Sequence, residues 1–304
     1  MITRDDVLRA RETIGDRLHH TPTISSRTLG ARLKCELFQR TGSFKPRGAL
    51  NKLSSLTADE RKRGVITYSA GNHAQGVAYA AALEGVDALI VMWGSVSPQK
   101  VAATRGYGAT VDLEATTSLE ALERMHLLIE ETGRVLVHPH EDPLVLAGAG
   151  TVGLEIEEDA PDVDAVLVAV GGGGLVSGIQ AAIGDRMRVI AVEPERSQAL
   201  HAGIAAGHPV TVEPASIADG LNPPRCGQLP IDLCRDLERV LVTEDEIKDA
   251  FRFLYERAKL AVEPAGAAAA AALLARKIEA DNPVVIVSGG NVAPEITSGI
   301  LGSR

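Results

Sequence analysis

The chain has 304 residues, of which 45% are apolar and only 3% aromatic, so it can form two domains or one large α/β unit around a core of Ala, Val, Leu and Ile. Its net charge of −9, without a basic run, argues against nucleic acid and anionic membrane surfaces as partners. The longest apolar run, over 265–275, is too short to span a membrane, and Cys35, Cys226 and Cys234 lack metal-type spacing, as is typical of a cytoplasmic protein.

The first part of the chain is predicted to form a helix and a short strand that lead to a lysine. Thr3 is a suitable helix cap, and Val7 and Leu18 lie on one apolar face of the helix that follows, which the His20-Thr21-Pro22 sequence would end. A strand over 35–38 is expected to connect this helix to the turn at Lys45.

From residue 65 onward, short apolar runs alternate with helical patterns. Continuous apolar strands separated by helices are typical of a parallel sheet covered on both faces. The strands are expected over 65–67, 88–92, 110–113, 135–137, 165–170, 189–192, 240–242 and 284–287. The helices are expected from 73 and 98, over 119–130, over 144–157 with an interruption at AGAG, and from 175, 244, 264 and 293. Because no linker of biased composition is visible, a second domain would be an insertion.

Lys45 stands in the stretch TGSFKPRGALNKL, over 41–53. Pro46 favours an extended conformation at Lys45 and can open a helix. Thr41, Ser43 and the free amides of that helix start are donors for an anion, and the positive end of the helix dipole disfavours a protonated amine. The pattern predicts a neutral, nucleophilic lysine of the kind that forms Schiff bases, and the alternative is a solvated lysine on a loop.

Four consecutive glycines, Gly171 to Gly174, follow a buried strand and precede a helix. Backbone amides and a helix N-terminus then meet at one point without side chains between them, which predicts a phosphate cradle. The dinucleotide pattern G-x-G-x-x-G is not met, because Ser177 stands at its last position. Glu193 ends the next strand where a ribose-binding acid would stand, so a nicotinamide-dependent dehydrogenase is an alternative.

Two further segments end predicted strands with polar residues. In SAGNH, over 69–73, Ser69, Asn72 and nearby amides can hold a carboxylate at a helix start, whereas His73 is expected to cap or pack and not to transfer protons. Ser288 closes the last apolar strand at the carboxyl edge of the sheet, where open α/β sheets bind ligands. A nucleophilic lysine, a phosphate cradle, a carboxylate loop and a strand-end serine together indicate pyridoxal phosphate acting on an amino acid.

The order of these motifs resembles the serine/threonine dehydratase group, which includes serine racemase, of the tryptophan-synthase-β-like, fold type II pyridoxal-phosphate enzymes. The resemblance runs from about Thr21 to Val292 and rests on TGSFKPRGA, SAGNHAQGVA, GGGGLVSG, ADGL at 218–221 and SGGN. It implies an α/β fold with two open, mostly parallel sheets and helices on both faces. It also implies a large domain over 1–64 and 135–304, and a small mobile domain over 65–134 that carries the SAGNH loop.

The resemblance implies a role for each motif residue. Lys45 would be the Schiff-base lysine and later the base at Cα, and Phe44 would lie against the cofactor. Asn72 would bond the ring hydroxyl, and Ser288 would meet the pyridine nitrogen, where a neutral hydroxyl weakens the ring as an electron sink. The phosphate would be held by Gly171, Gly172, Gly173, Gly174 and the amide of Leu175, and the substrate carboxylate by Ser69, Ala70, Gly71, Asn72 and His73.

The implied reaction is α,β-elimination, in which L-serine or L-threonine loses its Cα proton and β-hydroxyl and becomes a 2-oxo acid and ammonia. Ala70 stands where racemases have a second serine, which favours one-way elimination. His140-Glu141 and the AGAG at 147–150 also depart from the family pattern. A serine racemase-like enzyme and a dehydratase for 3-hydroxyaspartate or phenylserine are therefore alternatives. A non-catalytic amino-acid-binding module is the alternative outside enzymes.

A metal and a partner subunit complete the expectations. Glu193 matches a ligand of the family's divalent-metal site, but Ala199 stands where a carboxylate would be expected. Glu193 is thus a metal ligand at most, and a bound divalent metal is doubtful. The resemblance further implies a homo-oligomer, a dimer, that acts on a small-molecule amino acid. Charge, composition and cysteine spacing predict a cytoplasmic protein that binds neither nucleic acid nor membrane.

Overall fold

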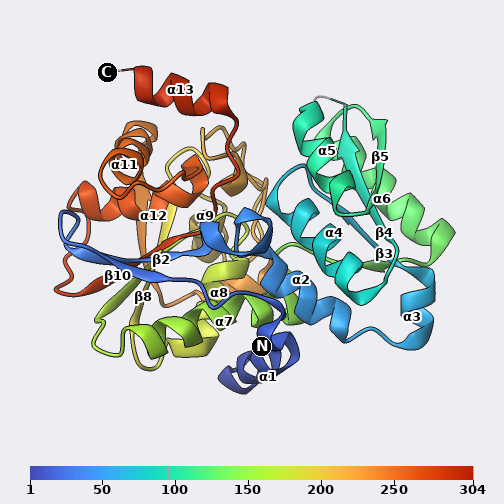
Figure 1. Cartoon of the computed structure of the whole chain (residues 1–304), viewed down its shortest axis with the longest axis horizontal. Helices are drawn as coiled ribbons and strands as arrows, with labels where there is room; N and C mark the ends of the chain where they lie inside the picture. The colour runs from blue at the N-terminus through green and yellow to red at the C-terminus, as the bar shows by residue number, and fades with distance from the viewer. Residues whose placement is uncertain (95, 304) are drawn as a thin grey trace.

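The computed structural model describes residues 1–94 and 96–303 and contains two open β-sheets with helices on both faces (Figure 1). The larger sheet has the strand order β1-β2-β10-β7-β8-β9 and is parallel except for the β1 and β2 pair, and the smaller sheet has the order β5-β4-β3-β6 and is wholly parallel. The strands are β1 (Thr23–Ser26), β2 (Ala31–Cys35), β3 (Val65–Tyr68), β4 (Ala88–Trp93), β5 (Thr110–Ala115), β6 (Val135–Leu136), β7 (Ala165–Ala169), β8 (Arg188–Pro194), β9 (Glu238–Val242) and β10 (Pro283–Val287).

Helices cover both faces of each sheet. Helices α11 and α12 pack on one face of the larger sheet and α7 and α8 on the other, while α2 and α4 lie on one side of the smaller sheet and α6 on the other. Within the described residues, no helix has the length and apolar character needed to cross a membrane. The helices are α1 (Arg4–Ile14), α2 (Lys45–Ser54), α3 (Ala58–Arg63), α4 (Asn72–Glu84), α5 (Pro98–Gly106), α6 (Ser118–Thr132), α7 (Pro143–Asp159), α8 (Gly174–Ile183), α9 (Ala199–Ala206), α10 (Gln228–Leu233), α11 (Glu244–Glu256), α12 (Pro264–Leu274) and α13 (Pro294–Gly302).

Strand β7 shows why the strands of the larger sheet are apolar along their whole length. Ala165 and Leu167 point into the core beneath α11 and α12, whereas Val166 and Val168 point into the core beneath α7 and α8. Successive side chains of a strand face opposite sides, so a strand buried on both sides cannot alternate with polar residues. The predicted fold class, two mostly parallel sheets covered on both faces, is confirmed.

The interruption expected at AGAG is absent, because α7 continues through Gly148 and Gly150. A side chain on Gly148 would overlap the backbone of Arg47 and Gly48 on α2, and one on Gly150 would overlap Gly178 on α8. These glycines allow three helices to approach closely, and they do not end a helix. The prediction of a break was wrong because glycine can end a helix and can also, inside a helix, allow neighbouring helices to pack closely.

Two other boundaries differ from expectation. Helix α1 ends before Gly15, which has φ +55°, and not at His20. The strand expected over 35–38 lies earlier, as β2, and residues 36–38 form a 3₁₀ turn. The sequence patterns also missed β1, α3, α9 and α10. The division into a large domain and a mobile domain over 65–134 stays a prediction, and β6, just beyond that boundary, pairs with β3 in the smaller sheet.

Candidate active site

A cavity of about 330 Å³ lies between the two sheets, where the chain leaves the carboxyl ends of β3, β7 and β10. Every residue to which the resemblance assigns the cofactor or the substrate carboxylate lines it, whereas Thr41, Ser43 and Glu193 do not. The lining residues among those predictions are Phe44, Lys45, Ser69, Ala70, Gly71, Asn72, His73, Gly171, Gly172, Gly173, Gly174, Leu175 and Ser288.

Lys45 begins α2, with Pro46 in the first turn. The N–H of Phe44 donates to the carbonyl of Ser288 at 3.2 Å, so the end of β10 fixes the backbone that carries the lysine. The surrounding protein removes the amine from water and lowers the pKa of Lys45 to about 8, although the carboxylate of Glu263 opposes this shift. The lowered pKa increases the share of neutral amine near neutral pH, and the neutral amine is the form that acts as a nucleophile.

The glycine loop forms a cradle without side chains at the start of α8. Gly173 has φ +91°, and a Cβ there would lie 2.5 Å from the Cβ of Pro230. A side chain on Gly172 would overlap the imidazole of His140, which covers this side of the loop. The first-turn amides of a helix lack intrahelical acceptors, so they remain available to an anion. The loop therefore fits the phosphate of pyridoxal phosphate.

Replacing Gly173 with alanine is expected to raise the dissociation constant of pyridoxal phosphate at least about tenfold, which corresponds to ~1.4 kcal/mol. The new Cβ would have to occupy a left-handed backbone conformation and push against Pro230, and both displace the loop amides. Fluorescence titration of the apoprotein with the cofactor measures this. Gly207→Ala is the matched control, because Gly207 also has positive φ, at +77°, but nothing lies within 4 Å of its added Cβ. Equal increases in this dissociation constant for Gly173→Ala and Gly207→Ala would contradict the role of the glycine loop as a phosphate cradle.

The SAGNH segment connects β3 to α4. The Gly71 N–H donates to Ser69 Oγ at 3.2 Å, and a side chain on Gly71 would meet open space. His73 Nε2 lies 3.0 Å from the carbonyl of Val137, while its Nδ1 is buried without a hydrogen-bond partner in the part of the chain that the structure describes. Burial lowers the pKa of His73 to about 3, so the ring is neutral and Nε2 donates to that carbonyl. The interpretation of His73 as a packing residue agrees with this geometry.

Three charged side chains in the cavity wall were given no role by the sequence analysis. Lys100 on α5 and Asp219 after α9 form an ion pair at 2.8 Å, which joins the two sides of the cavity. Glu263 occupies the position before α12 without a capping hydrogen bond from its side chain, which instead accepts a hydrogen bond from Asn72 Nδ2 at 2.7 Å. A single acid directly before a long apolar helix is the one signal that could have identified Glu263.

Glu193 lies outside the cavity, almost fully buried at the start of α9. Its two carboxylate oxygens accept the N–H groups of Leu200 at 2.8 Å and His201 at 2.9 Å. Burial raises the pKa of Glu193 to about 7, although these two amide donors oppose the shift. Among the described residues no group of three His, Cys, Asp or Glu side chains is arranged to hold a metal ion. Both carboxylate oxygens of Glu193 are already engaged by the backbone of α9.

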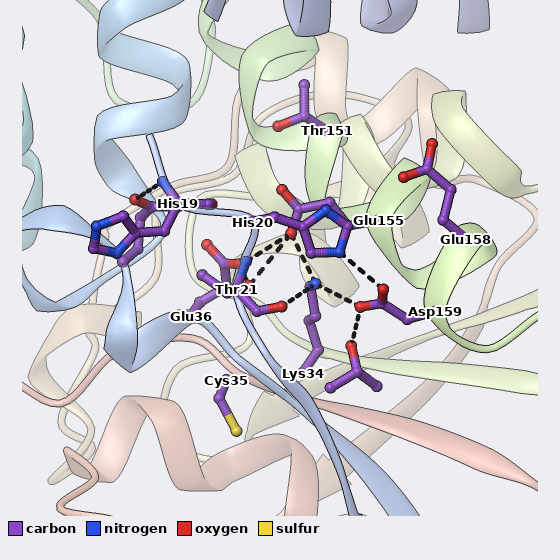
Figure 2. Close-up of polar contacts among 12 residues, drawn as sticks. His19, His20, Thr21, Lys34, Cys35, Glu36, Thr151, Glu155, Glu158 and Asp159 are labelled. Atoms are coloured by element: carbon purple, nitrogen blue, oxygen red, sulfur yellow. Dashed lines mark hydrogen bonds and ion pairs between the residues drawn. The ribbon is translucent and has the colours of Figure 1, made fainter. Parts of the chain in front are cut away.

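A buried charge network anchors α2. Arg47, in its first turn, is only 2% exposed and donates to Glu36 at 2.8 Å and to Glu155 on α7 at 2.6 Å. Lys34, fully buried on β2, pairs with Glu155 at 2.7 Å and with Asp159 at 3.1 Å (Figure 2). The network ties the first turn of the lysine-bearing helix to β2 and α7.

Comparisons with known proteins agree with this geometry. The chain is 43% identical to the L-threonine ammonia-lyase of Thermotoga maritima, over 96% of this chain and 76% of the relative. It is 41% identical to the L-threonine dehydratase catabolic TdcB of Escherichia coli, over 98% of this chain and 95% of the relative. The structure of maize serine racemase superposes with a TM-score of 0.93 at 35% identity, over 97% of this chain and 95% of that one. Residues 15–290 match the family described as pyridoxal-phosphate dependent enzyme, and the chain belongs to that family.

Proposed function

We propose that the chain catalyses α,β-elimination of a β-hydroxy L-amino acid, with L-threonine and L-serine as substrates, to a 2-oxo acid and ammonia. The observation that carries this proposal is the shared cavity, in which the amine of Lys45, the glycine loop and the SAGNH segment meet. The names of the threonine ammonia-lyase and threonine dehydratase relatives support the same reaction.

Each part of the cavity has a proposed task. Pyridoxal phosphate, when bound, draws electrons from Cα of an amino acid and makes its proton acidic. Lys45 holds the cofactor and takes the Cα proton, because burial keeps much of its amine neutral near pH 8. The first turn of α4 binds the substrate carboxylate, and that of α8 binds the phosphate. The neutral hydroxyl of Ser288 would hold the pyridine nitrogen without protonating it, and an unprotonated ring would favour prompt loss of the β-hydroxyl.

A serine racemase-like reaction is the second candidate, and the similarity to maize serine racemase favours it. Racemisation requires a proton donor on the face of Cα opposite to the base. Ala70 lines the cavity at the position where racemases have a second serine, and a methyl group cannot donate a proton. The side chain at this position therefore supports elimination.

The proposal is tested by incubating the holoenzyme with L-threonine, L-serine, 3-hydroxyaspartate and phenylserine. We expect 2-oxo acid and ammonia in equal amounts from L-threonine or L-serine, and no D-amino acid by chiral chromatography. D-Serine in excess of 2-oxo acid would favour the racemase. If only 3-hydroxyaspartate or phenylserine gave product, that amino acid would replace threonine and serine as the assigned substrate. No product from any of the four would contradict the proposed reaction.

We also propose that the reaction needs no divalent metal, because the carboxylate of Glu193 is already satisfied by the first amides of α9. EDTA is expected to change neither kcat nor Tm, and added Mg²⁺ or Ca²⁺ is expected to change neither. Ala199→Asp is the informative variant, since it restores a second oxygen ligand and should make Tm rise when Mg²⁺ or Ca²⁺ is added. A fall in the wild-type Tm on adding EDTA would show that a metal is bound.

The resemblance to the dehydratase group supports a homodimer in the cytoplasm, and both remain part of the proposal. Cys35, Cys226 and Cys234 are buried free thiols, which suits a reducing compartment. Sedimentation velocity measures the oligomeric state directly. A monomer that is fully active at all concentrations would contradict the dimer.

A further inference from the structure

Glu263 is a buried carboxyl group inside the active-site cavity, without a role in the reaction proposed above. Its side chain is 5% exposed, and its Oε1 accepts one hydrogen bond, from Asn72 Nδ2 at 2.7 Å. The Glu263 backbone is fixed as well, because its N–H donates to the carbonyl of Gly289 at 3.2 Å. Burying a carboxyl group makes folding less favourable. A carboxyl group that is buried near the catalytic lysine is therefore a candidate for a functional role.

The amide of Asn72 is held from both ends. While its Nδ2 donates to Glu263, its Oδ1 accepts from Asn291 Nδ2 at 2.8 Å. Asn291 Nδ2 uses its other hydrogen on the carbonyl of Thr41 at 2.7 Å, so it acts on Asn72 only as a donor. A flipped Asn72 would place donor against donor and acceptor against acceptor. One amide hydrogen of Asn72 is thus left over, and it belongs to a residue of the cavity wall.

The charges around Glu263 come from each side of the cavity. Burial raises its pKa to about 8, and Asp219 adds to this effect. The hydrogen bond from Asn72 and the cations of Lys100 on α5 and Lys45 on α2 oppose it. In either protonation state Oε1 can accept from Asn72. A protonated Glu263 could also donate to a flipped Asn72, and in that state the donor Asn291 Nδ2 fixes the orientation of the amide.

We propose that Glu263 is a positioning residue: with Asn291, it orients the amide of Asn72 so that the remaining amide hydrogen is directed to the bound cofactor. The inference rests on the proposed function, in which Asn72 bonds the ring hydroxyl of pyridoxal phosphate. A fixed donor at that hydroxyl favours its ionised form. The orientation of one side-chain amide therefore sets the electronic state of the cofactor.

The test compares two substitutions at this position in the holoenzyme. Glu263→Gln keeps an acceptor oxygen and similar volume, whereas Glu263→Leu removes the acceptor and leaves the amide of Asn72 held by Asn291 alone. The readout is the ratio of the two absorbance bands of the bound cofactor, which reports ionisation of the ring hydroxyl. Losing one hydrogen bond is expected to change this ratio and kcat by about three- to tenfold in Glu263→Leu, with KM within about twofold. Glu263→Gln is expected to retain the wild-type ratio at neutral pH.

Two controls make the outcome decisive. Glu279→Leu changes an exposed glutamate and is expected to leave the spectrum unchanged. Asn291→Ala removes the opposite partner of Asn72 and is expected to shift the band ratio in the same direction as Glu263→Leu, so the inference is testable even if Glu263→Leu fails to fold. A wild-type ratio in Asn291→Ala, or in a folded Glu263→Leu, would overturn the inference. The spectrum needs no substrate, so a failure of the threonine assay would not be mistaken for this result.

Discussion

Replacing Lys45 with alanine is expected to lower kcat by at least about 10²- to 10⁴-fold, which is the usual contribution of a positioned general base. The variant should also lose the covalent link to the cofactor, because Lys45 is the lysine of the cavity whose amine is made partly neutral by burial. Borohydride reduction followed by mass spectrometry checks this. The wild type should gain the mass of the cofactor on the peptide that contains Lys45, and the variant should not.

Lys52→Ala is the matched control for this substitution. Lys52 lies on the same helix but pairs with Asp142 at 2.9 Å, away from the cavity lining. The Lys52→Ala variant should retain wild-type activity and should still gain the mass of the cofactor on the Lys45 peptide after borohydride reduction. In the wild type, the rate at which the apoprotein takes up the cofactor should rise as pH increases through about 8, since only the neutral amine attacks. Wild-type turnover by Lys45→Ala would contradict the proposed role of the lysine.

The parts of the site that could be predicted from sequence are those in which the signal is local. Pro46 next to Lys45 predicted a helix start, and glycines directly after the apolar strand β7 predicted a cradle. The parallel sheet then brought these loops to one edge, because the carboxyl ends of parallel strands lie together. Alternating strands and helices were enough to predict this arrangement without a view of any side-chain contact.

The parts that escaped prediction depend on contacts between distant residues. Glu263 and its partner Asn72 are 191 positions apart, and Arg47 and its partner Glu155 are 108 apart. In the sequence Lys34 resembles an ordinary exposed lysine, yet it is fully buried on β2 and pairs with two carboxylates of α7. A sequence pattern contains no information on which charged side chains will be enclosed when sheets and helices pack, so these networks emerge only from the fold.

Replacing Arg47 with methionine is expected to lower the free energy of unfolding by about 3–5 kcal/mol, because it leaves Glu36 and Glu155 buried without their main cation. Urea denaturation of the holoenzyme measures the change. Burial alone would raise the pKa of Glu155, but Arg47 and Lys34 together lower it. The stabilisation by this carboxylate is therefore present above its ordinary pKa near 4.3 and is lost as pH falls through its lowered value. The difference in the free energy of unfolding between the wild type and Arg47→Met should therefore become smaller at acidic pH.

Arg235→Met is the control that distinguishes the effect on stability of losing a buried ion pair from that of losing an exposed one. Arg235 pairs with Asp232 at 3.1 Å on the surface, where such pairs contribute only about 0–1 kcal/mol. If Arg47→Met lowered the free energy of unfolding by no more than Arg235→Met does, the network would add no net stability. Helix α2 would then be held by its apolar residues Leu50 and Leu53 alone. If stability and cofactor affinity both fell, the network would be shown to hold the first turn of α2 in the position that the cofactor requires. The buried charges would then act on the active site through the backbone that they fix, without touching substrate or cofactor.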